Sequence, residues 1–427
     1  MEGIMALTAG ISREIITPPV GSFLFGYNDH QVSNSVHDDL TVTALALESD
    51  GRAILLLSVT VCLVHTSLAD RIRREAGAAA GIPAAQVILS ATHTHSGPRT
   101  DGFSKWGSVD ESYCEDIFIP KCIAVARAAM GTRKPVSVGM GTTESLVGIN
   151  RRQLLRDNKV ILGQNPWDMY DSTMTVIAFK CEDGTALANL VHVGAHCTAA
   201  GQNHEISRDW AGVMIDRLEE ESGAKTLFFN GTAGDIAPRM ANGGSTGDMR
   251  HAMELGGLAG IDAVRAYKTI RSYRDEPLAF SSGDITIPFT APIPKETVTR
   301  RLNELSGKWS WELASMEQLD KLYRSGSLGA EALSFRQTVI RLGPAVFVPF
   351  PFETCTEIGF RLKAYSPFAH TLLLSCTNGS NSYLPAQSQL CRGGYEVDSF
   401  RWSRPRQLPD DTDRLLIDEN LKLIEKL

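Results

Sequence analysis

Two histidines stand one residue apart where an apolar run of the sequence ends. His93 and His95 follow the run Val87–Ala91, and small residues follow them. Other residues that can bind a metal ion or move a proton also come after β-rich runs. Two or three imidazoles and a carboxylate that converge at strand ends form the ligand set of a catalytic zinc site with an open position for water. The residues placed in this way are His93, His95, His196, Asp235, Glu353 and Tyr383.

Each of these residues also has an ordinary structural interpretation. A histidine pair in a loop is more often a hydrogen-bonded turn than a metal site, and the sequence contains no fixed zinc motif such as H-E-x-x-H. His192 and His196 lie on the same face of a strand with a two-residue period, so either could point to a site. Asp235 could cap the backbone of its own turn. Glu353 could instead cap a helix, and Arg151 could form a surface ion pair. Tyr383 and Tyr395 could be packing aromatics.

The candidate residues need strands to position them, and the sequence alternates strand and helix patterns throughout. Thr41–Glu48 and Ala53–Val64 are β-rich runs joined by a turn with Asp50 and Gly51 at its centre. No internal repeat or low-complexity linker divides the chain. The alternation predicts one large α/β domain with mixed β-sheets flanked by helices, with the zinc site at strand ends. Helices are predicted at 68–80, 113–130, 207–222, 249–268 and near the C-terminus, and strands at 87–91, 136–139, 172–180, 186–196, 226–230, 334–353 and 370–376.

Three local features complete this outline. Residues 1–30, which include the stretch ITPPVG, are expected to be extended and rich in turns. The helix that begins near residue 207 is expected to use Ser207 or Asp209 as its N-cap. Residues 295–334 are charged and are expected to form two surface helices as an insertion. Trp309 and Trp311 lie close together there, so these helices could cover an apolar groove or simply pack on the surface.

Composition and charge argue against several classes of protein. The 427 residues carry a net charge of −7 and no block of Lys or Arg, so no nucleic-acid partner is expected. The longest apolar run, Ala53–Val64, is shorter than the roughly 20 residues of a membrane-spanning helix, so no transmembrane segment is predicted. The N-terminus lacks the basic region of a signal peptide, and a cytoplasmic location is expected. The eight cysteines contain no C-x-x-C pair and are expected to be free thiols.

Seven blocks of the sequence resemble the neutral/alkaline (non-lysosomal) ceramidases, a family of zinc-dependent amidases. They occur in the family's order and span residues 9–396, nearly the whole chain. The blocks are AGISREIITPPVG at 9–21, ATHTHSGP at 91–98, INRR at 149–152, HCTAAGQNHEISRDWAG at 196–212, NGTAGDIAP at 230–238, PFETCTEIG at 351–359 and SYLPAQSQLCRGGYE at 382–396.

The resemblance implies a role for each candidate residue. It selects His196 over His192, because the family's pattern H-x-T…S-x-D-x-x-G fits only at His196. The implied zinc ligands are His93, His196, Glu353 and Tyr383. The residues implied around the substrate amide are His95, Arg151 and Tyr395.

The sequence also departs from the family. Ala237 stands where ceramidases have a serine, and Leu390 where they have a tyrosine. About 30 residues follow the last block, too few for the family's immunoglobulin-like C-terminal domain, since such domains take about 100 residues. Residues 1–427 are therefore expected to form a ceramidase-like zinc amidohydrolase domain without that addition. The expected substrate is a smaller or more soluble N-acylated amine, with ceramide-type lipid as the alternative.

The expected reaction is hydrolysis of an N-acyl amide by zinc-activated water. Arg151 and Tyr395 would stabilise the developing oxyanion, and His95 would move a proton to the leaving amine. Asp209 and Asp235 could orient a zinc-binding imidazole, or act only as an N-cap and a turn residue. A zinc esterase or phosphoesterase and a non-catalytic zinc protein are the rival interpretations. The expected partner is a small-molecule or lipid N-acyl amide, and the chain could form a homo-oligomer.

Overall fold

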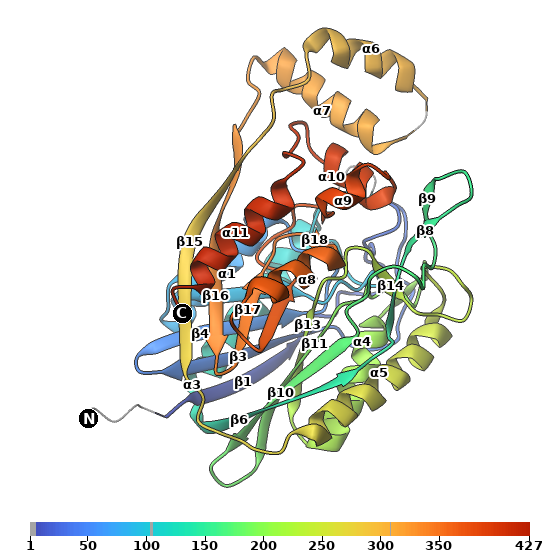
Figure 1. The fold of residues 1–427 in the computed structure, drawn as a ribbon. Coiled ribbons are helices and arrows are strands. Elements are labelled where there is room, and N and C mark those ends of the chain that lie inside the picture. Colours follow the sequence, from blue (N-terminus) through green and yellow to red (C-terminus); the bar gives the residue numbers. More distant parts are fainter. Residues whose placement is uncertain (1–5, 103–105, 308) are drawn as a thin grey trace.

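Two β-sheets pack face to face between layers of helices (Figure 1). The computed structural model describes residues 6–102, 106–307 and 309–427. None of the helices in these ranges has the length and apolar character needed to cross a membrane.

The larger sheet supplies both histidine-bearing loops. Its eight strands, in spatial order, are β13 (Lys225–Asn230), β11 (Ala186–Val193), β10 (Thr173–Cys181), β6 (Lys134–Glu144), β1 (Thr8–Ile15), β3 (Thr41–Ser49), β4 (Arg52–Val59) and β5 (Val87–Ala91). The edge pairs β4–β5 and β11–β13 are parallel, and the inner pairs are antiparallel. Parallel strands need a crossover, and it contains a helix in each case: α1 (Thr66–Ala80) or α4 (Asp209–Ser222).

The smaller sheet has four strands and lies over the larger one. In spatial order they are β15 (Leu278–Pro288), β16 (Ala332–Leu342), β17 (Ala345–Pro349) and β19 (His370–Leu374). The first three are antiparallel neighbours, and β17 and β19 are parallel and joined through α8 (Thr356–Tyr365).

The alternation of side chains along the strands explains why the sheets stack. In β3, Leu45 and Leu47 point to one face of the sheet, and Ala44 and Ala46 point to the other. The two leucines join the apolar core between the sheets, together with side chains of β16 and β17. The two alanines belong to the core under the helices on the opposite face. The larger sheet is therefore buried on both faces.

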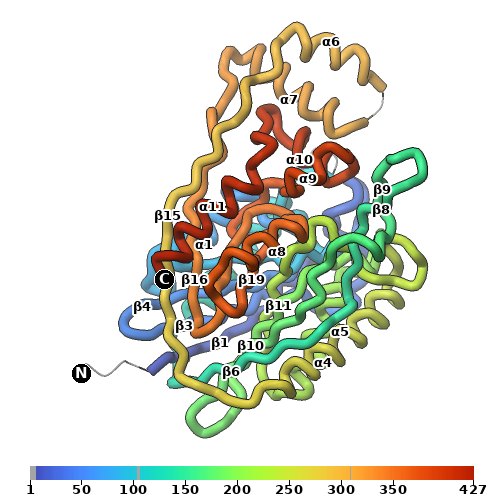
Figure 2. The backbone as a smooth tube through the Cα atoms, viewed as in Figure 1, coloured from blue at the N-terminus to red at the C-terminus, as the bar shows by residue number. Residues whose placement is uncertain are grey.

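Helices cover the outer face of each sheet. On the larger sheet, α1 and α3 (Ile119–Gly131) pack over the end containing β3 and β5, and α4 and α5 (Met249–Thr269) over the end containing β10 and β13. On the smaller sheet, α8 and α11 (Thr412–Ile424) form the outer layer. The tube in Figure 2 shows the same succession of helix, sheet, sheet and helix.

Shorter elements build the loops around this framework. A hairpin of α6 and α7 extends from one end of the smaller sheet and contacts α10 (Figure 1). These elements are β2 (Ser35–Val36), η1 (Ala84–Gln86), α2 (Glu111–Tyr113), η2 (Cys114–Phe118), β7 (Gly148–Asn150), β8 (Arg152–Leu154), β9 (Val160–Leu162), β12 (Glu205–Ile206), β14 (Ile236–Pro238), α6 (Lys295–Leu305), α7 (Trp311–Ser325), β18 (Glu353–Thr354), β20 (Tyr383–Leu384), α9 (Gln387–Leu390) and α10 (Tyr395–Trp402).

The prediction of a single α/β domain with mixed sheets and flanking helices is confirmed, but two local predictions are wrong in detail. The helix predicted at 113–130 is present, and it includes a π-helical turn at Cys114–Phe118. The N-cap of α4 is Arg208, and not Ser207 or Asp209 as predicted. Asp209 has φ of +57°, and its backbone N–H donates to Oγ of Ser207 at 3.0 Å. The predicted helical region 295–334 ends early, since β16 already begins at Ala332.

Candidate metal centre and active site

The candidate metal ligands lie in segments that follow strands of both sheets, and these segments meet at one edge of the stack. His93 follows β5 and His196 follows β11, both in the larger sheet. Glu353 and Tyr383 begin the short strands β18 and β20, where they are direct partners in a parallel pair. All four residues are buried, each at most 4% exposed. Loops after strands thus bring together residues that are far apart in the sequence.

The polar atoms of these side chains point at one another. Oε2 of Glu353 lies 3.2 Å from Nε2 of His93 and 3.1 Å from Nε2 of His196. The hydroxyl of Tyr383 lies 3.2 Å from the same nitrogen of His196. His93, His196 and Glu353 form a group whose ligand atoms lie within 4.8 Å of one another, close enough to hold a metal ion.

The second ring nitrogen of each histidine fixes the direction of the ring. Nδ1 of His93 lies 2.9 Å from the carbonyl oxygen of Cys62, and Nδ1 of His196 lies 2.7 Å from that of Ala233. A backbone carbonyl only accepts, so Nδ1 of a neutral ring carries the proton and donates it. The lone pair then sits on Nε2, facing Glu353, which is the tautomer that a metal-binding histidine needs.

The backbone conformation at His93 points the side chains of His93 and His95 in different directions. Residues two apart on a regular strand face the same side. His93, however, has φ of +73°, in the left-handed region that few residues other than glycine adopt. The two rings meet edge to face, with centroids 4.9 Å apart and an interplanar angle of 83°. Such backbone strain is concentrated at functional sites, which favours a functional role for this turn.

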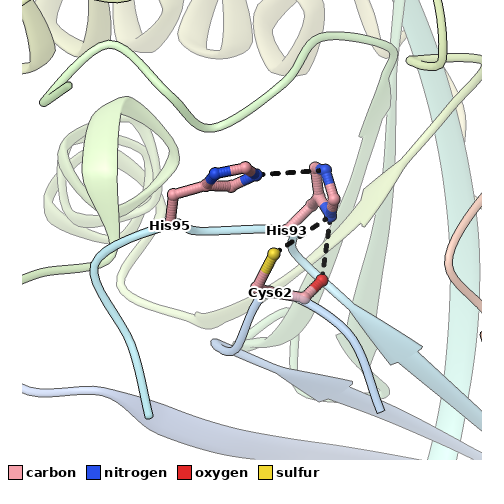
Figure 3. Close-up of side chains that lie close together, drawn as sticks. All are labelled: Cys62, His93 and His95. Atoms are coloured by element: carbon pink, nitrogen blue, oxygen red, sulfur yellow. Dashed lines mark hydrogen bonds between the residues drawn. The ribbon is translucent and has the colours of Figure 1, made fainter. Parts of the chain in front are cut away.

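A second group of potential ligands shares His93 and includes Cys62 and His95 (Figure 3). Sγ of Cys62 lies 3.7 Å from Nδ1 of His93, and the two histidine Nε2 atoms lie 3.4 Å apart. Sγ of Cys62 thus lies on the Nδ1 side of the His93 ring, away from the Nε2 atom that faces Glu353. Nδ1 of His93 also donates to the Cys62 carbonyl. The group of His93, His196 and Glu353 is therefore the better candidate.

Burial and neighbouring charges set the protonation states. Burial alone would raise the pKa of Glu353, but the imidazoles of His93 and His196 outweigh it and hold that pKa well below its usual range. Burial lowers the pKa of His196 to about 4. Burial also disfavours the charged form of His93, but the neighbouring thiols and Glu353 raise its pKa overall. A metal ion would therefore compete with a proton at His93.

Arg151 is held by a buried carboxylate that sequence reasoning missed. Nε of Arg151 donates to Glu396 at 2.8 Å, and Nη1 of Arg152 donates to the other oxygen of Glu396 at 2.6 Å. Burial would raise the pKa of Glu396, but the two guanidiniums outweigh it and lower that pKa. The guanidinium carbon of Arg151 lies 5.4 Å from the ring centre of Tyr383 and 5.8 Å from that of Tyr395. The position of Glu396 directly after Tyr395 was the only sequence signal for it.

His95 packs against a tyrosine that sequence reasoning also missed. The rings of Tyr27 and His95 have centroids 5.1 Å apart. Gly26 has φ of +124°, and a Cβ atom there would lie 2.3 Å from Nδ1 of His95, so glycine is required for this approach. Burial, helped by the charges of His93 and His196, lowers the pKa of His95 well below its usual value. His95 is therefore a neutral imidazole at the rim of the metal group.

Known proteins that resemble this chain in sequence or fold are neutral ceramidases. The chain is 24% identical over 249 residues to neutral ceramidase A of Dictyostelium discoideum and 29% identical over 244 residues to neutral ceramidase B of the same organism. It superposes on a solved ceramidase complexed with C2 with a TM-score of 0.76 at 18% identity, over 99% of this chain and 76% of that chain. The chain therefore resembles the neutral ceramidases in part of its sequence and in its fold. The neutral ceramidase of Pseudomonas aeruginosa gives the same TM-score at 19% identity, over 99% of this chain and 75% of that chain.

The resemblance to the neutral ceramidases read from the sequence blocks is thus confirmed, although the coverage is partial. The alignments take 53% and 50% of this chain and 35% and 33% of the two Dictyostelium relatives. The chain therefore spans about a third of the length of the curated relatives it matches. No protein-family model matches the chain.

The two residues that depart from the neutral ceramidases lie in packed surroundings beside the site. Ala237 is buried in β14 and pairs with Ile149 of β7, directly before the strand end that carries Arg151. Leu390 is 8% exposed and belongs to the apolar core of the smaller sheet, with Phe400 of α10. Leu390 therefore contributes to packing.

Neither Asp209 nor Asp235 contacts an imidazole. The carboxylate of Asp209 accepts from the backbone N–H groups of residues 199, 200 and 210, at 3.1, 2.8 and 2.7 Å. Asp235 accepts from the backbone and hydroxyl of Thr356, at 2.8 and 2.9 Å, and from Gln389 at 3.0 Å. Of the two roles left open for these residues, their hydrogen bonds favour the structural one. Both carboxylates instead hold the loops that follow His196 and Glu353.

A cavity of about 230 Å³ adjoins the metal group, and Glu353 and Tyr383 line it. Its apolar wall is formed by Phe25, Trp106 and Trp311 together with Leu63, and its polar lining includes serines and Arg404. Trp311, the first residue of α7, lies 5.9 Å from the ring of Tyr395 and 6.3 Å from that of Trp106. The hairpin of α6 and α7 therefore contributes one side chain, Trp311, to the wall of this cavity. A larger surface groove, of about 820 Å³, includes none of the candidate ligands.

Proposed function

We propose that this chain is a zinc-dependent amidohydrolase that cleaves an N-acyl amide bond with water. One observation carries the proposal. Nε2 of His93 and Nε2 of His196 each approach Oε2 of Glu353 to within 3.2 Å in a buried site, next to the hydroxyl of Tyr383. Kinship with the neutral ceramidases supports the same reaction class.

The chemistry of the donor set fits a zinc ion. In a neutral ring each Nε2 atom is an acceptor, because Nδ1 donates to a carbonyl oxygen, and a carboxylate only accepts. Such acceptors face one another around a cation, either a proton on His93 or a metal ion, and nitrogen and oxygen ligands suit zinc. The residues that would hold the ion are His93, His196, Glu353 and Tyr383. A bound zinc ion supplies a Lewis acid that activates water at neutral pH.

The other residues of the site act on the amide. His95, a neutral imidazole, accepts a proton from the attacking water and passes it to the amine as the carbon–nitrogen bond breaks. Burial raises the pKa of Tyr395, which keeps its hydroxyl a hydrogen-bond donor. Nη2 of Arg151 is buried and has no hydrogen-bond partner among the described residues, so it is free to donate. We assign Arg151 and Tyr395 to the oxyanion that forms on the carbonyl oxygen.

Metal analysis combined with a substrate screen tests this function. Protein purified without chelators should contain one zinc per chain and should hydrolyse some N-acyl amides from a series of acyl chain lengths. Removal of the metal with a chelator should abolish the activity, and added zinc should restore it. A metal-free protein, or one that cleaves only esters or phosphoesters, would contradict the proposal.

We further propose that the substrate is smaller than a two-chain lipid. The cavity beside Glu353 has a volume of about 230 Å³, below the range of about 300–1,000 Å³ typical of ligand pockets. Three aromatic side chains confine it: Phe25, Trp106 and Trp311. A cytoplasmic location and a homo-oligomer stay predictions.

Ceramide is the second candidate substrate, favoured by the names of the relatives. Hydrolysis of a long-chain ceramide in detergent, measured beside short N-acyl amines, separates the two. We expect the best short amide to exceed ceramide in kcat/KM by more than tenfold, about 1.4 kcal/mol of transition-state binding. A ceramide value within tenfold of the best substrate would favour the lipid.

A further inference from the structure

Arg404 is a partly buried cation that has no counter-charge among the described residues. It lines the cavity that Glu353 and Tyr383 also line. Within the described residues, no carboxylate lies within 4.0 Å of its guanidinium, whereas Arg151 and Arg152 are both bonded to Glu396. Desolvation lowers the pKa of Arg404 to about 10, so the group remains protonated at neutral pH. A partly desolvated charge without a counter-ion gains free energy from an anionic partner, which a ligand in the cavity could supply.

The protein contacts of Arg404 leave donors unused. Nη1 donates to the carbonyl oxygen of Phe400 at 3.4 Å, and Nη2 donates to that of Asn381. A guanidinium has five N–H groups in a planar fork, so further donors remain. Ser403, the next residue in the chain, also lines the cavity, and its hydroxyl is buried without a hydrogen-bond partner in the described part of the chain.

The other charged groups of the cavity do not neutralise Arg404. Glu353 is engaged by the two histidines. Asp101 accepts from the N–H of Gly102 at 2.7 Å, and burial raises its pKa. His65 has its Nδ1 atom 2.8 Å from the hydroxyl of Ser67. The cavity therefore has an apolar aromatic wall, the metal group, and one guanidinium with donors to spare.

We propose that Arg404 binds a carboxylate on the amine half of the substrate, so that the enzyme acts on small N-acyl amino acids. The acyl chain would lie against Phe25, Trp106 and Trp311, and the amide would lie beside Glu353. A planar guanidinium matches a carboxylate or a phosphate in a two-bond fork. The small volume favours the carboxylate over the larger phosphate. This inference rests on the proposed amidase function and adds the substrate class.

A matched set of substrates tests the assignment. N-butanoylglycine carries the carboxylate, N-butanoylglycinamide is its neutral counterpart, and N-butanoylethanolamine phosphate carries the alternative anion. For the zinc-loaded enzyme we expect kcat/KM to be at least about tenfold higher for N-butanoylglycine than for the amide, because hydrogen bonds to charged groups are strong. Equal kcat/KM values for N-butanoylglycine and N-butanoylglycinamide would overturn the proposal. A higher value for the phosphate substrate would overturn the assignment of a carboxylate as the anion.

Variants locate the effect at Arg404. Arg404→Gln should lose the preference for the carboxylate, so that its kcat/KM for N-butanoylglycine no longer exceeds that for N-butanoylglycinamide, and Arg404→Lys should keep part of the preference. Arg406→Gln is the control, because Arg406 donates to the carbonyl oxygens of residues 290 and 330 and does not line the cavity. Loss of activity on both substrates alike in folded Arg404→Gln would mean that Arg404 only holds the loop. If Arg404→Gln fails to fold, the proposal is still tested by the preference of the wild-type enzyme for the carboxylate substrate and by the reduced preference expected of Arg404→Lys.

Calorimetry separates this inference from the function on which it rests. Binding of N-butanoylglycine and N-butanoylglycinamide is measured to wild-type protein and to Arg404→Gln. If no amide is hydrolysed but the carboxylate ligand binds more tightly, and only with Arg404 present, the amidase function fails and the anion site stands. If amides are hydrolysed but neither binding nor kcat/KM distinguishes the pair, the function stands and the anion site fails.

Discussion

The two sheets contribute to the candidate metal centre in different ways. The larger sheet supplies His93 and His196, whose rings are fixed by backbone carbonyls on their own side of the site. Glu353 and Tyr383 lie in β18 and β20, which follow β17 and β19 of the smaller sheet and form a separate two-stranded sheet. The histidines are thus positioned by loops at the end of the large sheet. Glu353 and Tyr383 are aimed by mutual pairing, and their position depends on how the sheets stack.

A third histidine connects the two sheets. His192 lies in β11 of the larger sheet, and its Nε2 atom is 2.8 Å from the carbonyl oxygen of Leu373 in β19 of the smaller sheet. It lies four residues before His196, but its polar contact is to the backbone of the other sheet. His192 therefore links the two sheets, whereas His196 faces Glu353 in the candidate metal centre.

The largest difference in metal content should come from replacing each of these two histidines by alanine in turn. His196→Ala removes a nitrogen that faces Glu353, and we expect nearly all bound metal to be lost. His192→Ala should keep the metal and cost about 1–3 kcal/mol in unfolding free energy, because it removes a buried hydrogen bond. Metal content and denaturant unfolding measure the two effects. Retained metal in His196→Ala together with lost metal in His192→Ala would show that the wrong histidine was chosen.

The contribution of the β18–β20 pair can be divided between its two ligands. Glu353→Gln should weaken metal binding more than Tyr383→Phe, because it removes the only negative charge among the four ligand side chains. Glu353 also approaches both histidines, whereas the Tyr383 hydroxyl is bonded to one of them, His196. Competition with a chromogenic chelator measures both affinities. A larger loss in Tyr383→Phe would make the tyrosine the principal ligand of this pair.

Tyr395 follows the ligand strand β20 but is expected to act on the substrate. Tyr395→Phe removes a hydroxyl donor and should lower kcat by about 100- to 1,000-fold, the usual cost of one oxyanion donor. Metal content should stay full. Kinetics and elemental analysis on the same preparation provide the check. Lost metal in this variant would instead assign Tyr395 to the metal centre.

Glu396 is expected to be a positioning residue for Arg151. Glu396→Gln leaves two buried guanidiniums without their carboxylate, and we expect a loss of about 3–5 kcal/mol in unfolding free energy. kcat should also fall while metal content is kept. The conservative variant Glu396→Asp should recover part of the stability. Unchanged stability in Glu396→Gln would mean that the two arginines do not depend on this ion pair.

The smallest effect concerns the loop that packs on His95. Gly26→Ala would place a Cβ atom 2.3 Å from Nδ1 of His95, so His95 must shift and kcat should fall. Gly21→Ala is the control, since Gly21 also has positive φ, +99°, but no atom lies within 4 Å of its Cβ position. Both variants should lose about 1–3 kcal/mol from backbone strain. Equal kcat values would show that the contact with His95 does not matter.

The sequence by itself determined the local part of this architecture. Strand periodicity and turn residues predicted Val87–Ala91 as a strand, and the structure has this strand with the same bounds. The helix predicted at 68–80 ends, as expected, before a left-handed glycine, Gly81. The candidate site could be predicted in the same way. Each strand end and the histidine that follows it, His93 or His196, lie within a few residues of one another in the sequence. The resemblance of seven blocks then supplied the roles that spacing alone left open.

Only the tertiary structure decided which side chains meet. The pairing of Glu353 with Tyr383 joins residues 30 positions apart through a two-residue ladder, which is too short to leave a periodic signal. The bond from Arg151 to Glu396 and the approach of Gly26 to His95 are also long-range, and neither has a spacing rule. Asp209 and Asp235 looked like site residues by proximity in the sequence, yet their carboxylates face backbone and neighbouring side chains. Direction in space depends on how sheets and loops pack, and that packing is fixed by contacts between distant residues.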